Sequence, residues 1–195
     1  MKKSALALVA LAGIACTAVA QDSPWMVRAR AVNLNMANQD GTALHLTVND
    51  KTIPEVDVSY FFTPNLAAEL ILSVPQKQTV SSSGASIGTF KHLPPTLFLQ
   101  YHFTGLSGYK PYVGVGYNYT LISSTRLTSP YTLDGHSSGV AVQAGVDFPI
   151  DKQWSINLDV KKVNLSTHVY GASRADQGVL KLDPLLVGIG LGYRY

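Results

Sequence analysis

Hydrophobic residues alternate with polar or small residues along most of the chain after residue 24. This period of two is typical of β-strands with one apolar face, whereas amphipathic helices follow a longer period. No apolar stripe at helical spacing extends over a useful length in this part of the sequence. Most of the alternating runs have about the 9–11 residues that a tilted strand needs to cross a bilayer. There are eight runs, over residues 25–35, 55–63, 65–74, 95–104, 110–123, 138–149, 153–167 and 183–195.

The connections between these runs are short and long in turn. Short connections follow the second, fourth and sixth runs, and long polar ones follow the first, third, fifth and seventh, as in QKQTVSSSGASIGTFKH at residues 76–92. An up-and-down meander with all long loops on one side explains this order, and a soluble sandwich does not. We therefore predict an all-β fold, an eight-stranded antiparallel up-and-down transmembrane β-barrel.

The last run indicates which face of the barrel is outside. One face holds only large apolar or aromatic residues, and the other is mostly glycine. A glycine face suits the crowded interior of a small barrel, so the apolar face is expected to point into lipid. A soluble lipocalin-like barrel would need the opposite arrangement. The two faces are Leu185, Val187, Ile189, Leu191, Tyr193 and Tyr195 against Gly188, Gly190, Gly192 and Arg194.

The inward positions of the runs, with Arg194 of the last run included, carry charged and polar side chains. Four of these are cations and five are anions, so pairing inside the barrel can reduce the cost of desolvation. They are expected to line the lumen or simply to fill it as a packed polar plug, and both readings stay open. Phe98 is an apolar inward position, with Phe61, Ile71 and Ile122. The polar set is Arg28, Arg30, Glu55, Asp57, Glu69, Gln100, His102, Gln143, Asp147, Asp159, Lys161 and Arg194.

Aromatic residues mark the run ends that adjoin short turns or the chain termini. Rings gather at the membrane interface of outer-membrane barrels. This predicts that both termini and the short turns face the periplasm and that the long loops are extracellular. The six residues are Trp25, Phe62, Phe103, Phe148, Trp154 and Tyr195.

The first twenty residues have the features of a cleaved secretory signal. Lys2 and Lys3 precede an apolar run that closes on small residues. A membrane anchor and lipid attachment at Cys16 are the alternatives. Cleavage would leave residues 21–195 as the barrel, remove the single cysteine, and take two of the three net positive charges. The remaining charge gives no reason to expect a nucleic-acid partner.

Two consecutive prolines open the fourth run in HLPPTLFLQYHF, at residues 92–103. Proline donates no ladder hydrogen bond, so it belongs at a strand edge, a strand start or a bulge. Pro94 and Pro95 therefore mark either the start of a strand at the end of a loop or a break in the barrel wall.

The chain resembles the OmpW family of Gram-negative outer-membrane proteins. The resemblance rests on WMVRARAVNLN, IPEVDVSYFFTPNLAAEL, HLPPTLFLQYHF, KPYVGVGYNYT and the terminal GIGLGYRY, in order along the chain. The terminal residue is tyrosine, where the family more often has phenylalanine. The resemblance implies that Tyr193 and Tyr195 serve as the signal for the barrel-assembly machinery.

The family resemblance also implies a function. It suggests a narrow, largely apolar channel in the outer membrane for passive uptake of small hydrophobic molecules, with lateral exit through the wall. We expect Pro94 and Pro95 to help form that lateral gap. Apolar residues in the long connections agree with this function, namely Leu44, Leu46, Val48, Ile87 and Phe90.

Catalysis has little support in the sequence. The five histidines lack the spacing of a metal site, and there is no G-x-S-x-G serine motif. We therefore predict no enzyme activity, no metal and no cofactor, with lipid modification by a Ser/His pair from distant loops as the rival. The main alternative is a structural or surface-interaction barrel that acts as a receptor for phage, bacteriocin or host factors without transport.

Overall fold

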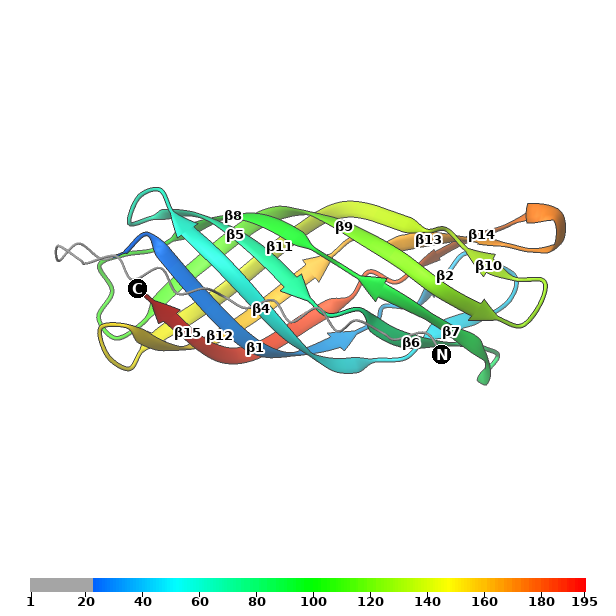
Figure 1. The fold of residues 1–195 in the computed structure, drawn as a ribbon, viewed down its shortest axis with the longest axis horizontal. Coiled ribbons are helices and arrows are strands. Elements are labelled where there is room, and N and C mark those ends of the chain that lie inside the picture. Colours follow the sequence, from blue (N-terminus) through cyan, green and yellow to red (C-terminus); the bar gives the residue numbers. More distant parts are fainter. Residues whose placement is uncertain (1–22) are drawn as a thin grey trace, which may run out of the picture.

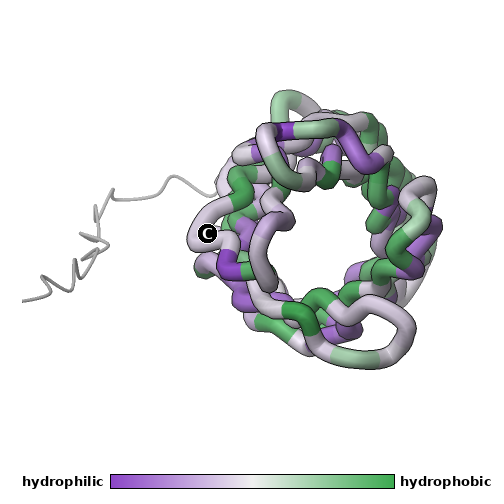
Figure 2. The backbone as a smooth tube through the Cα atoms, turned by 90° about the vertical axis from the view of Figure 1, so that its right-hand side faces the viewer, coloured by the Kyte–Doolittle hydropathy of each residue, from purple (hydrophilic) through white to green (hydrophobic). Residues whose placement is uncertain are grey.

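The computed structural model describes residues 23–195, so the predicted signal at residues 1–20 lies outside the described residues. Eight strands pair antiparallel with their neighbours, and β1 pairs with β15 to close the ring. Seen end-on, the backbone forms a closed barrel (Figure 2). The predicted fold class is confirmed. The strands are β1 (Trp25–Asn35), β4 (Lys51–Phe61), β5 (Leu66–Ser73), β8 (Thr96–His102), β9 (Lys110–Leu127), β11 (His136–Pro149), β12 (Trp154–Val163) and β15 (Leu185–Arg194).

The long connections contain more strand than the sequence indicated. In place of the loop expected at residues 76–92, β6 (Gln76–Ser82) and β7 (Ala85–Leu93) form a hairpin that pairs with the far part of β9. The sheet also includes β3 (Leu46–Val48), which pairs with β6. A second sheet contains β10 (Thr132–Leu133), β13 (Ser166–Tyr170), β14 (Asp176–Lys181) and β2 (Gln39–Asp40), and a 3₁₀ turn spans Ala172–Arg174. The wall thus continues well beyond the eight-stranded ring (Figure 1).

Short turns connect the strands at the opposite end, which also holds the C-terminus (Figure 1). We call it the turn end, and the other the loop end. Asp151 closes one turn by accepting hydrogen bonds from the backbone N–H groups of Trp154 and Gln153, at 2.7 and 2.8 Å. These two bonds hold the pKa of the Asp151 carboxyl below its usual value.

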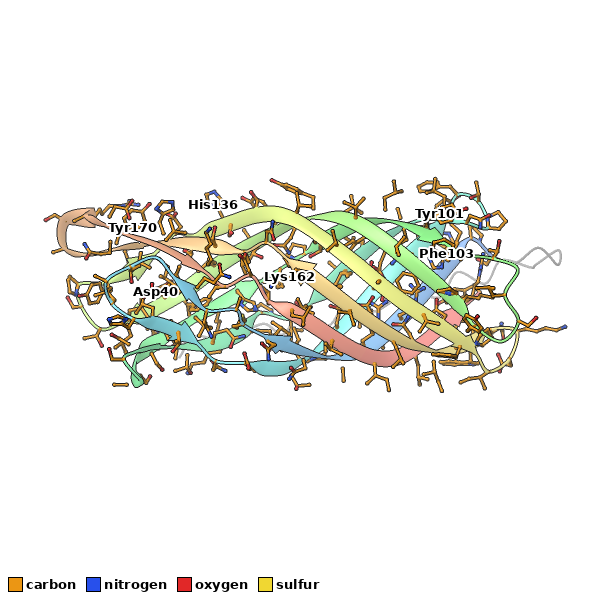
Figure 3. The ribbon with its side chains drawn as sticks, turned by 180° about the vertical axis from the view of Figure 1, so that it is seen from behind. Asp40, Tyr101, Phe103, His136, Lys162 and Tyr170 are labelled. Carbon is orange, nitrogen blue, oxygen red and sulfur yellow. The ribbon has the colours of Figure 1, made fainter. Side chains whose placement is uncertain are left out.

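The outer surface of the ring is a belt of exposed apolar side chains. Val115, Tyr117 and Ile189 are 56–57% exposed. In every run the apolar residues of the alternating pattern lie on this outer side. The six aromatic residues of the predicted girdle are all exposed. Tyr101 and Phe103 lie near the turn end, while Asp40 and Tyr170 lie at the loop end (Figure 3). In residues 23–195 no helix is long and apolar enough to span a bilayer.

Candidate functional site

The barrel interior changes character along its axis. At the turn end it opens into a vestibule, in the middle it is filled by charged side chains, and toward the loop end it becomes apolar. This order follows from the inward residues of each strand. On β1, for example, Arg28 and Arg30 are followed by Val32 and Leu34, all of them buried.

The vestibule is a cavity of about 720 Å³ lined by residues of the short turns and strand ends. Arg194, predicted to line the lumen, lies here with its guanidinium 4.2 Å from the ring centre of Phe61. Its Nε donates to the carbonyl of Ser23 at 3.1 Å. Phe61 packs with Met26 and Ala67 in a small cluster of its own. Phe61 was expected among the apolar lumen residues, but it lies at the other end of the barrel, because it follows the charged positions on β4.

Arg28 anchors the polar layer next to the vestibule. Its Nε and Nη2 donate to the two carboxylate oxygens of Asp147, at 3.2 and 2.8 Å. Its Nη1 donates to the hydroxyl of Ser59 at 3.0 Å and lies 3.4 Å from Asp57. The Arg28 side chain is fully buried, so these partners replace its hydration.

Arg30 lies one step further along β1 and contacts three carboxylates. Its Nη1 is 2.6 Å from Asp57 Oδ2 and 3.1 Å from Glu55 Oε1, and its Nη2 is 3.1 Å from Glu69 Oε1. Its Nε donates to Asn157 Oδ1 at 2.6 Å. One guanidinium thereby joins side chains from β1, β4, β5 and β12.

Neutral side chains connect the remaining charges. Gln143 donates to Glu69 Oε2 and Asp159 Oδ2, at 2.9 and 2.8 Å, and accepts from Gln100 Nε2 at 3.0 Å. His102 Nε2 lies 2.9 Å from Gln100 Oε1. Lys161 binds the carboxylates of Asp159 and Glu55. We call the whole set the polar network: Arg28, Arg30, Glu55, Asp57, Ser59, Glu69, Gln100, His102, Tyr112, Gln143, Asp147, Asn157, Asp159 and Lys161.

The polar network obstructs the straight path along the barrel axis. All its members are buried, and they come from every strand of the ring except β15. Eight strands enclose little more space than side chains fill. A molecule that followed the axis would have to break several buried ion pairs.

Toward the loop end the interior is lined by buried hydrophobic residues, which we call the apolar layer. Phe98, predicted to line the lumen, belongs to it and is 1% exposed. The layer continues into the hairpins beyond the ring through Phe90, Val80 and Leu46. Nearest the polar network it comprises Val32, Leu34, Ile53, Ile71, Phe98, Ile122, Ala141, Val163, Leu165 and Leu186.

A small cavity lies where the two layers meet. Its wall includes Glu55 and Lys161 of the polar network, Leu34 and Ile71 of the apolar layer, and Pro94. Its volume of about 30 Å³ is that of a single water molecule, and ligand pockets are usually several hundred Å³. The conformation described is therefore a closed one.

Pro94 lines this cavity, and Pro94 and Pro95 lie between β7 and β8. The β5–β8 ladder ends at Ile71–Thr96, and the β6–β7 ladder begins at Gln76–His92. Within the described chain, no ladder pairs join residues 72–75 to residues 93–95 across this seam. The Pro95 carbonyl still accepts from the backbone N–H of Tyr119, at 3.1 Å, so the seam with β9 is intact. The interruption is thus confined to one side of the proline pair.

The predicted site residues occupy several places. Arg28, Arg30, Glu69, Gln100, His102 and Asp159 meet in one network, whereas Phe98 and Arg194 lie on opposite sides of it. Tyr193 and Tyr195 pack edge to face at the turn end, with ring centres 5.0 Å apart. Three members of the polar network were not predicted from the sequence: Ser59, Tyr112 and Asn157. Their inward position in the alternating pattern could have identified them. Ser59 and Asn157 each lie two residues from a charged inward residue, and Tyr112 directly precedes an outward valine.

In the described chain no group of histidine, cysteine, aspartate or glutamate is arranged to hold a metal ion.

A closed barrel with an apolar outer belt and a charged interior defines the class of transmembrane β-barrels. The profile of the OmpW family matches residues 20–195. The chain belongs to the OmpW family and is a protein of the bacterial outer membrane.

Comparison with known proteins supports this assignment. The chain is 39% identical over 191 residues to the outer-membrane protein y4mB of Sinorhizobium fredii, covering 89% of this chain and 80% of that protein. It is 24% identical to the dibenzothiophene metabolism operon protein PahQ of Pseudomonas aeruginosa, covering 90% of each. The crystal structure of OprG from Pseudomonas aeruginosa superimposes with a TM-score of 0.74 at 25% identity, covering 89% of this chain and 97% of that one.

Proposed function

We propose that the protein is a passive channel through which small hydrophobic molecules enter at the loop end and leave sideways through the barrel wall. The observation that carries the proposal is the position of the wall interruption. It lies where the apolar layer ends and the polar network begins, beside a cavity lined by Pro94. An apolar molecule that descends through the apolar layer meets charges ahead of it and a gap beside it.

The proposed direction requires the loop end to face the exterior and the turn end, where the described chain begins and ends, to face the periplasm. The exposed aromatic girdle places the turn end at a membrane interface, and the short turns at that end support the periplasmic side. The continuation of the wall beyond the apolar belt at the loop end also supports it, because outer-membrane barrels have their long connections outside.

The name of one relative agrees with an apolar cargo. PahQ is named for a dibenzothiophene metabolism operon, and dibenzothiophene is a polycyclic compound with little polarity. The proposal involves no catalytic step, because the chain would change only the path of the molecule.

A direct test measures uptake of a small apolar fluorophore, and ion conductance, in liposomes that contain the refolded protein. We expect uptake above that of empty liposomes together with low conductance, because the polar network closes the axis to ions. Leu186→Trp should reduce uptake severalfold, since Leu186 lines the small cavity. Leu185→Trp on the lipid side is the matched control and should not. A folded barrel without uptake would contradict the channel.

The lateral exit has its own test. Replacing Pro94 and Pro95 together by valine restores two backbone donors, which should extend the ladder toward residues 72–75 and reduce uptake severalfold. Pro111→Val, in β9 near the turn end, is the control and should leave uptake unchanged. Unchanged uptake in the double valine variant, with heat-modifiable folding intact, would rule out the proline seam as the exit.

A receptor function is the second candidate. It is favoured by the second sheet and the 3₁₀ turn beside it, which carry the exposed side chains of His168 and Arg174. The Arg174 guanidinium lies 5.3 Å from the ring centre of Tyr170. A folded protein without uptake or conductance would favour this role over the channel.

A further inference from the structure

Three polar side chains near the wall interruption have buried atoms without hydrogen-bond partners. These atoms are Ser73 Oγ, both side-chain polar atoms of Gln78, and both ring nitrogens of His92, and within residues 23–195 nothing pairs with them. Gln78 is 0% exposed and His92 is 1% exposed. Buried polar groups in native proteins are nearly always paired. This cluster therefore needs an explanation.

The three side chains follow one another along the inner wall toward the proposed exit. Gln78 on β6 is opposite Phe90, and His92 on β7 is opposite Gln76, one step closer to the ring. His92 and Ser73 both line the small cavity that contacts Pro94. The order from the loop end is thus Gln78, then His92, then Ser73 beside the seam.

Neighbouring polar groups on β8 and β9 are paired with each other. Asn118 Nδ2 donates to Thr96 Oγ1 at 2.8 Å, and Thr120 Oγ1 donates to Asn118 Oδ1 at 2.7 Å. Gln76 Nε2 donates to the carbonyl of Val74 at 2.9 Å. The fold can therefore satisfy polar groups in this region, and leaves a particular set of them unpaired.

The chemistry of the unpaired set defines what would complement it. Burial disfavours the charged imidazolium, so the His92 ring offers one donor and one acceptor. The Gln78 amide and the Ser73 hydroxyl also offer both. Ile71, Phe90 and Val80 give these groups apolar neighbours in the buried cluster, while Glu55 and Lys161 line the inner side of the small cavity. A compact apolar molecule with one neutral hydrogen-bonding group fits such a wall.

We propose that Gln78, His92 and Ser73 form a binding site for the hydroxyl or carbonyl group of a small, otherwise apolar molecule. The inference rests on the proposed channel and specifies its substrate class. A hydrocarbon without a polar group leaves these atoms desolvated and unpaired, whereas a hydroxylated analogue pairs with them. Sites built to hydrogen-bond a ligand group discriminate against analogues that lack it.

The test compares 1-naphthol with naphthalene, which have the same ring skeleton. Uptake of each is measured in protein-containing liposomes relative to empty ones. We expect wild type to favour 1-naphthol by about tenfold, the effect of roughly one well-made hydrogen bond. The double variant His92→Phe/Gln78→Leu should lose this preference and retain naphthalene uptake. His136→Phe alters an exposed histidine and should keep the preference.

The outcomes separate the site from the channel. If naphthalene and 1-naphthol enter equally in wild type, or the preference survives in the double variant, the site is wrong and the channel stands. If neither compound enters, the channel is wrong. The site is then decided by binding alone, from the nitrogen NMR shifts of His92 in ¹⁵N-histidine-labelled protein titrated with 1-naphthol in detergent. A shift absent from the double variant supports the site, and unmoved His92 nitrogens overturn it.

Discussion

Replacing Arg30 by methionine is expected to destabilise the barrel by about 3–5 kcal/mol, the usual cost of removing one partner from a buried ion pair. Arg30 lies within 3.1 Å of Glu55, Asp57 and Glu69, and all three carboxylates are buried. Without the guanidinium these three buried carboxylates lose their shared cation and repel one another. The measurement is reversible urea unfolding in lipid vesicles, followed by tryptophan fluorescence.

Two further variants isolate the cause. Arg30→Lys keeps the charge but loses the planar fork of donors, so its loss should be smaller. Lys77→Met removes a cation from an exposed position on β6 and should change the free energy of unfolding by less than about 0.5 kcal/mol. If Arg30→Met unfolded at the same urea concentration as Lys77→Met, the polar network would occupy the lumen without contributing to stability.

Replacing Gly190 by alanine should also weaken or prevent folding, with a cost at or above about 3 kcal/mol. A Cβ at this position would lie 2.1 Å from the carbonyl oxygen of Ala29 and 2.8 Å from Arg30 Cα. Both are backbone atoms of the paired strand β1, so the clash can be relieved only by shifting the strands. The expected readout is loss of the heat-modifiable band on electrophoresis, or a lower urea midpoint.

Gly188 is the matched control on the same inward face of β15. Its added Cβ would meet Val32 Cγ2 at 3.2 Å, the end of a side chain, and a small displacement relieves that contact. Gly188→Ala should therefore fold and lose about 1 kcal/mol or less. Equal losses in the two alanine variants would mean that close approach of the strands is not what requires glycine at residue 190.

Much of the fold could be predicted because barrel strands repeat every two residues. The split of the last run into large apolar residues and glycines was enough to identify the outer face. The β6–β7 hairpin could not be recognised, because residues such as Gln76, Gln78 and Thr79 carry no apolar alternation. These residues form a strand through pairing with β7, which itself pairs with β9, and single-sequence patterns do not reveal such pairing.

The candidate site was predictable in its composition but not in its contacts. Inward parity placed Arg28, Arg30 and Asp159 inside, but the distance of each along the axis depends on strand register. That is why Phe61 was grouped with residues from the other end. Gln78 and His92 were missed for a related reason, because they lie in a segment whose polarity indicated a solvated loop.

The polar network has a consequence for the order in which the strands enter the membrane. Its contacts join residues distant in sequence, such as Arg28 with Asp147, 119 positions apart, and Glu55 with Lys161, 106 apart. A hairpin of β1 and β4 inserted alone would expose its charged face to hydrocarbon, at a high energetic cost. Arg28 reaches Asp147, and Glu55 reaches Lys161, only when β1 and β4 share the barrel with β11 and β12. Ring closure must therefore accompany insertion, because a partly assembled sheet is unstable in the bilayer.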